Sequence, residues 1–344
     1  MKRERGLDFA RAFAAIGIVV FHFYCHCASA HKLFLNNANG AWGTAINYLF
    51  FALSGYLLHS KYGKQEMSLT GFYYKRWKAT MPAYIAVFLF AYRLNGCETG
   101  KLFYLEIPRW RLLLSFIGLD GYASWVAPTY FITGEWFLGA ILVAYCAYPL
   151  LRFFAKNTHI WVRYAALLVL IGLYVALFRV EFWGLPISTN PITCLLCFYL
   201  GMLGVELAHI LKKPVVVLLC AVLCGICVAV PLGGEGTTEM LLAGCTGLVV
   251  LSSIGDVICK SDRIYRVVHT VSGLTYPVFL IHHRIILKVL EGFNPVSTKL
   301  SLVVLGGILL TCFVFASILE VVMKSLFQSS LYLKFESLFQ GKKE

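Results

Sequence analysis

Hydrophobic positions in this chain fall into ten long stretches separated by shorter polar segments. A transmembrane helix needs about 20 mostly apolar residues to cross a hydrocarbon core of about 30 Å. The pattern therefore predicts an all-α, polytopic membrane bundle that forms a single domain over residues 1–344. Its ten helices are expected at 8–28, 43–60, 78–94, 134–152, 162–180, 190–210, 214–232, 237–256, 270–290 and 299–324.

One connection is much longer than the others and spans residues 95–133. It contains an apolar run, 112–119, which is too short to cross a bilayer. Aromatic residues, which favour the membrane–water interface, flank this run. We therefore expect an outer loop with an interfacial or re-entrant piece rather than another span.

The composition supports the membrane assignment and excludes a soluble globule. Hydrophobic residues make up 59% of the chain and charged residues only 14%, whereas soluble domains carry about 25% charged residues. The net charge of +13 would suggest nucleic-acid binding in a soluble protein. In a membrane protein the position of the basic residues instead indicates topology, and we expect no nucleic-acid partner.

The basic residues lie asymmetrically across the predicted bundle. With the N-terminus inside, 20 of the 30 Lys and Arg residues fall on the inner side, nine on the outer side, and Arg11 within the first helix. Because cytoplasmic loops carry an excess of Lys and Arg, both termini are predicted to be cytoplasmic in a multi-pass protein of the bacterial cell membrane. Cleavage of the first helix as a signal peptide after 28–30 would spoil this asymmetry, so we expect the helix to be retained.

The first predicted helix carries ionisable residues that are costly at membrane depth, about 2.5–3.5 kcal/mol each at a helix centre. Asp8 and Arg11 stand at i, i+3, and His22 follows Arg11 by eleven residues. Eleven residues are three helical turns plus about 20°, so Arg11 and His22 share a face about 16 Å apart along the axis. The alternative is a snorkelling arginine and a histidine that is hydrogen-bonded within the bundle.

Further polar residues lie in the fourth and ninth predicted helices. Glu135 opens the fourth, and His282, His283 and Arg284 lie at mid-depth in the ninth. Three adjacent residues cannot all face one direction on a helix, so at most two point into the bundle. His22 and His26 have the i, i+4 spacing of metal ligands, but no third ligand is evident, and no metal is expected.

Five short motifs, in order along the chain, resemble the membrane-bound acyltransferase-3 family. The first is the Arg, ten residues, then His hallmark of that family's opening helix, here Arg11 and His22 within a Leu7-Asp8-Phe9-Ala10-Arg11 context. Ala10 and Ala12 replace the usual Leu and Gly without removing a chemical group. The other four motifs lie at 50–58, 72–82, 135–138 and 275–282 of this chain, and each is similar to a helix motif of that family.

The resemblance implies transfer of an acyl group, usually acetyl, from cytoplasmic acyl-CoA to a hydroxyl of an extracytoplasmic or membrane-linked acceptor such as a cell-surface glycan. Acyl-CoA would be the donor substrate, with no tightly bound cofactor. We expect His22 to act as general base or acyl carrier, assisted by Arg11. The expected donor-binding residues are Arg11, Lys75, Arg76 and Lys78, and the expected substrate-binding residues are Glu135, Ser54, Tyr276 and His282.

Two other functions fit the composition. A transporter or flippase for a lipid-linked sugar or small solute also needs many helices and buried charges, although the chain shows no convincing internal repeat of the kind common in transporters. A non-catalytic scaffold gives no reason for the alignment of Arg11 with His22.

Overall fold

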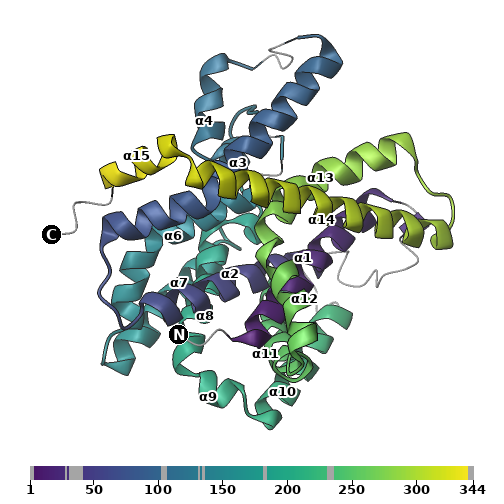
Figure 1. The fold of residues 1–344 in the computed structure, drawn as a ribbon. Coiled ribbons are helices and arrows are strands. Elements are labelled where there is room, and N and C mark those ends of the chain that lie inside the picture. Colours follow the sequence, from purple (N-terminus) through teal and green to yellow (C-terminus); the bar gives the residue numbers. More distant parts are fainter. Residues whose placement is uncertain are drawn as a thin grey trace.

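A computed structural model describes residues 4–27, 29–30, 42–101, 107–130, 132–133, 136–180, 184–230 and 236–339. These residues form helices and connections, and no strand occurs among them. The chain folds into a bundle with α1 running through its middle (Figure 1). The helices are α1 (Arg5–His26), α2 (Trp42–Tyr62), α3 (Leu69–Thr99), α4 (Leu112–Phe116), α5 (Asp120–Ala123), α6 (Trp136–Ala155), α7 (Ile160–Ala176), α8 (Pro191–Glu206), α9 (Ala208–Leu211), α10 (Pro214–Ala229), α11 (Thr237–Ile258), α12 (Asp262–Gly273), α13 (Thr275–Gly292), α14 (Thr298–Gln328) and α15 (Ser330–Phe339), with 3-10 turns η3 (Arg109–Arg111) and η4 (Ile187–Thr189).

Each of the ten predicted ranges contains a helix, and the all-α prediction is confirmed for the described residues. Two ranges are divided: 190–210 breaks between α8 and α9, and 270–290 includes a 62° bend between α12 and α13. Four helices, α1, α6, α11 and α14, are long and apolar enough to cross a membrane, and the bent pair makes a fifth candidate. Helices α7, α8 and α10 are apolar but shorter. The structure thus supports a membrane protein, and the count of ten spans stays a prediction.

The long connection contains short helices in its described part. Helix α3 runs on to Thr99 and ends at Gly100, whose φ of 66° is the left-handed conformation that glycine adopts without strain. The apolar run beginning at Leu112 forms only the five residues of α4, followed by α5. A helix of that length covers about 8 Å and cannot span a bilayer.

Helices α2 and α8 pack with their backbones in direct contact. A methyl group added at Gly55 would overlap the carbonyl oxygen of Phe198, and one added at Gly201 would overlap that of Ala52. Small residues at such positions let transmembrane helices approach closely and gain van der Waals contact. The Tyr148 hydroxyl of α6 donates to the Leu58 carbonyl at 3.0 Å, which joins a third helix to this pair.

Helix α1 is held by polar contacts near its N-terminus. The Gly6 N–H, which has no partner within the helix, donates to Asp256 Oδ1 of α11 at 3.0 Å. The carboxylate of Asp8 accepts from the Tyr265 hydroxyl at 2.9 Å and from Ser272 Oγ at 3.2 Å, both on α12. Helix α1 also contacts α2, α13 and α14, so it packs against several helices of the bundle (Figure 1).

Candidate active site

Three histidines from two helices converge at the α1–α13 interface. The ring centroid of His22 lies 3.9 Å from that of His283 and 5.0 Å from that of His282. One ring nitrogen from each of the three lies within 4.8 Å of the other two. His26, one turn beyond His22, is exposed, and its ring lies 6.2 Å from that of His283. The structure therefore brings together His22, predicted to be catalytic, and His282, predicted to bind substrate, and adds His283.

The histidine cluster lies in apolar surroundings. Ile18, Val19 and Phe23 of α1 pack with Val278 and Ile286 of α13 in one buried cluster on either side of it. His282 is only 1% exposed, and its Nδ1 lies 2.7 Å from the Phe279 carbonyl oxygen. A carbonyl oxygen only accepts, so Nδ1 carries the proton and Nε2 carries a lone pair. His22 and His283 are half-buried.

A second candidate region is a cation-lined cavity at the N-terminal end of α1. Its volume is about 500 Å³, and Arg11, Lys61 and Arg76 line it together with Ser54 and Tyr145. The guanidinium of Arg76 lies over the rings of Phe72 and Tyr145, at 5.9 and 5.7 Å. Asp8 and Glu4 line the same cavity, but the three cations outnumber them. The cavity suits an anionic ligand such as a phosphate group.

Two of the four predicted donor-binding residues line this cavity and two do not. Arg11 and Arg76 line it, as does Ser54, which was expected to bind substrate. Lys75 is exposed and Lys78 forms an ion pair of 2.7 Å with Glu336 of α15; neither lines the cavity.

The other two predicted substrate-binding residues are not placed in either region. The Tyr276 hydroxyl donates to the Thr80 carbonyl oxygen at 2.9 Å and so ties α13 to α3. Glu135 lies outside the described residues. Arg284 donates to the side-chain oxygen of Asn95 on α3 and lines neither region.

Sequence reasoning missed two residues of these regions. Helical periodicity alone does not say which of two adjacent histidines turns toward α1, and the predicted substrate-binding set includes His282 without His283. Lys61 stands outside the predicted donor-binding set, although its place in the last turn of α2 puts it beside Ser54, about two turns earlier on the same helix. The seven-residue spacing of Ser54 and Lys61 could have indicated Lys61, whereas the place of His283 depends on which helices are neighbours.

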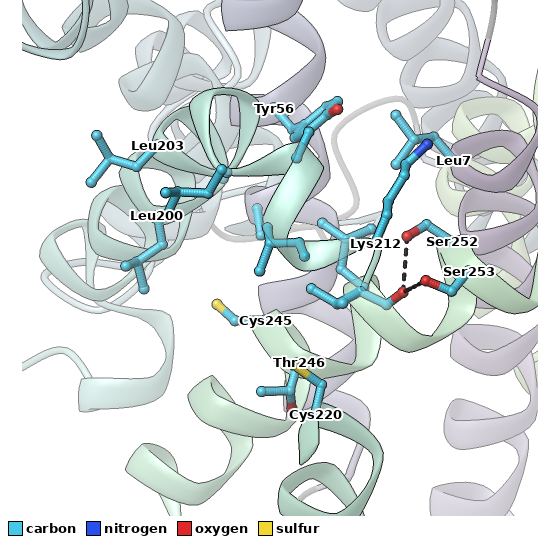
Figure 2. Close-up of a pocket in the computed structure, with 18 of the residues that line it drawn as sticks. Leu7, Tyr56, Leu200, Leu203, Lys212, Cys220, Cys245, Thr246, Ser252 and Ser253 are labelled. Carbon is cyan, nitrogen blue, oxygen red and sulfur yellow. Dashed lines mark hydrogen bonds between the residues drawn. The ribbon is translucent and has the colours of Figure 1, made fainter. Parts of the chain in front are cut away.

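A third cavity, between α1, α2, α8 and α11, is apolar. Its volume is about 290 Å³, and Figure 2 shows Leu200 and Leu203 on one side of it and Lys212 with Ser252 and Ser253 on the other. The Lys212 amine at its edge pairs with Glu4 at 3.3 Å and with Asp256 at 3.1 Å. The hydroxyls of Ser252 and Ser253 donate to the Val249 carbonyl within their own helix (Figure 2). The lining of this pocket is mostly apolar, and the polar groups named here are already paired within the protein.

Comparison with known families identifies the chain. Residues 4–320 match the acyltransferase-3 family model, described as an acyltransferase domain. The chain belongs to the acyltransferase-3 family. The resemblance drawn from five short motifs is confirmed, and the matched range contains all described members of the histidine cluster and of the cation-lined cavity. Searches of curated proteins and of solved structures returned no match.

Membership of the acyltransferase-3 family and the apolar helices together make this protein a membrane acyltransferase. In an acyltransferase, the two regions that contain residues of α1, the histidine cluster and the cation-lined cavity, can be compared with what the reaction requires. A catalytic acyl transfer needs a group that activates the acceptor and a place that holds the donor. The histidine cluster and the cation-lined cavity are the candidates for these two roles.

Proposed function

We propose that this acyltransferase moves an acyl group, with acetyl expected, from cytoplasmic acyl-CoA to a hydroxyl of an extracytoplasmic or membrane-linked glycan. One observation carries the proposal: a single rigid helix, α1, bears Arg11 in the cation-lined cavity and His22 in the histidine cluster. The two residues lie about 16 Å apart along the helix axis. An extended pantetheine arm has a comparable reach, so the CoA phosphates could bind near Arg11 while the thioester approaches His22.

In this proposal His22 acts as a general base. It takes the proton from the acceptor hydroxyl while the oxygen attacks the thioester carbonyl carbon. The carbon–oxygen bond forms, the carbon–sulfur bond breaks, and the proton passes from the imidazolium to the departing CoA thiolate. General base catalysis of this kind contributes typically about 10²–10⁴ in rate.

We place both termini and the cation-lined cavity on the cytoplasmic side of the bacterial cell membrane. The support is the excess of basic residues at that side in a ten-helix arrangement. Acyl-CoA is made in the cytoplasm, so this orientation brings the donor to Arg11 and leaves the His22 end for an acceptor from outside.

The test compares surface glycans from cells that express the wild-type chain, His22→Ala or His209→Ala. His209 lies exposed on α9, outside both candidate regions, and serves as the matched histidine control. Mass spectrometry should find ester-linked acyl groups with the wild-type and His209→Ala proteins and a loss of about 10²–10⁴ in initial transfer rate with His22→Ala. Wild-type ester levels with a folded His22→Ala protein would overturn the assignment of His22.

The alternative role of His22 as an acyl carrier has a separate test. Purified protein incubated with radiolabelled acetyl-CoA and no acceptor should retain no label on His22 if the residue is a base. A label that disappears in His22→Ala would instead assign the carrier role. A transporter would move substrate without consuming acyl-CoA, and membership of the acyltransferase-3 family disfavours that function.

A further inference from the structure

The histidine cluster has a feature that acyl transfer by a single base does not require. Three imidazoles, from His22, His282 and His283, each present a nitrogen to a common space, all within 4.8 Å of one another. Imidazole nitrogens bind zinc at about 2.0–2.1 Å, so three ligands of one tetrahedral ion stand about 3.3 Å apart. The present spacing exceeds that distance by at most about 1.5 Å, the difference between 4.8 and 3.3 Å.

The state of His282 is a second, independent observation that points to a ligand. Its Nδ1–H donates to the Phe279 carbonyl at 2.7 Å, which leaves the Nε2 lone pair available. That Nε2 is buried and has no hydrogen-bond partner among the described residues. Buried polar atoms are nearly always partnered, because an unpaired one costs about 1–3 kcal/mol. Metal-binding histidines characteristically donate their other ring N–H to a carbonyl or carboxylate in this way.

We propose that His22, His282 and His283 form a site for a divalent transition metal ion such as Zn²⁺, and that the bound ion suspends acyl transfer. A His22 nitrogen that binds the metal cannot take a proton from the acceptor, so metal and reaction compete for one lone pair. The three imidazoles would fill only three of the four positions of a tetrahedral zinc ion, and two of the rings are half-buried rather than enclosed. A hydroxide or another small anion at the fourth position would offset part of the charge that the apolar surroundings disfavour.

The two parts of this proposal depend on different premises. Metal binding rests on the spacing of the three imidazoles and on the unpartnered Nε2 of His282. Inhibition rests on the proposed function of His22 as the base. The experiment therefore measures binding and activity separately, so that failure of one can be told from failure of the other.

The full chain, purified in detergent after treatment with EDTA, is dialysed against ZnCl₂ and its metal content is measured by elemental analysis. We expect one tightly bound ion per chain in the wild-type and His209→Ala proteins. Replacement of a ligand should weaken binding by at least the roughly 10–100-fold known for outer-shell partners, in both His282→Ala and His283→Ala. His282→Asn and His283→Gln, which keep a polar side chain of similar size, guard against loss of fold, monitored by size-exclusion profile and circular dichroism.

Activity is measured in parallel as acyl transfer with and without ZnCl₂. Zinc should inhibit the wild-type chain, and EDTA should restore the rate. Zinc binding that is unchanged in folded His282 and His283 variants would overturn the site. Specific zinc binding in a chain with no transfer activity would instead leave the site standing and remove the proposed function. Transfer that zinc does not affect, in a chain shown to bind it at these residues, would overturn the inhibitory role.

Discussion

The α2–α8 and α1–α13 interfaces lie in the same bundle and are built on opposite principles. Between α2 and α8, Gly55 and Gly201 bring backbone against backbone, and the surrounding side chains, such as Phe51 and Phe198, are fully buried. Between α1 and α13, imidazole rings replace apolar groups, and the Nε2 atom of His282 is buried without a partner. The α2–α8 interface gains close van der Waals contact. The α1–α13 interface instead keeps imidazole rings where leucine side chains would pack more favourably.

This contrast indicates where stability and chemistry reside. Apolar contact in a membrane comes from close packing, since lipid tails are as apolar as the side chains themselves. Polar groups at membrane depth are costly and mark functional positions. We therefore expect substitutions at α2–α8 to change folding, and substitutions at the α1 sites to change activity while the fold remains.

The largest expected effect is a loss of folding from a larger residue at the α2–α8 contact. In Gly55→Val, the added side chain meets the Phe198 carbonyl oxygen, which belongs to a helix backbone and cannot rotate away. Overpacking costs typically about 1–3 kcal/mol and more where no side chain can yield. We expect little folded protein in detergent by size-exclusion chromatography. Gly172→Val is the control, because nothing lies within 4 Å of that position on α7; equal yields of the two variants would contradict the close contact.

A smaller effect, on donor binding alone, is expected at the cation-lined cavity. Hydrogen bonds to charged groups contribute about 1.5–3 kcal/mol, so Lys61→Gln and Arg76→Gln should each raise the KM for acyl-CoA about tenfold or more. Lys78→Gln should leave that KM unchanged, since Lys78 pairs with Glu336 instead of lining the cavity. The measurement is initial transfer rate against donor concentration.

A neighbouring polar cavity provides a control for the same measurement. It lies on the other side of the end of α2, is larger, at about 1030 Å³, and is lined by Lys64, Lys156 and Arg163 among others. A donor KM that rises with Lys156→Gln and not with Lys61→Gln would move donor binding to that cavity.

The sequence predicted the helices better than it predicted the contacts between them. Period and length placed a helix in each of the ten ranges, and the shared face of Arg11 and His22 follows from helix geometry alone. Which helices become neighbours depends on packing, which periodicity does not encode. The pairing of His283 with His22, across more than 250 residues of chain, therefore emerged only in the structure.

Charge was harder to assign than apolar pattern for a related reason. Lys75, Arg76 and Lys78 are close in sequence and appear equivalent, yet they point in different directions from α3. Arg76 faces the cavity and Lys78 faces α15. A basic segment on a helix distributes its side chains around the axis by 100° per residue, so only part of it can serve one ligand.

The smallest expected effect separates structure from chemistry at Tyr276. The sequence assigned this residue to substrate binding, whereas its hydroxyl donates to the Thr80 carbonyl at 2.9 Å. If that bond is its role, Tyr276→Phe should lower the free energy of unfolding by about 1 kcal/mol, the usual net contribution of one hydrogen bond. The midpoint of thermal unfolding in detergent would fall slightly, while the KM for acyl-CoA and the KM for the acceptor stay unchanged. A raised acceptor KM with an unchanged midpoint would return Tyr276 to the site and would mean that α13 carries chemistry along more of its length than the histidine cluster alone.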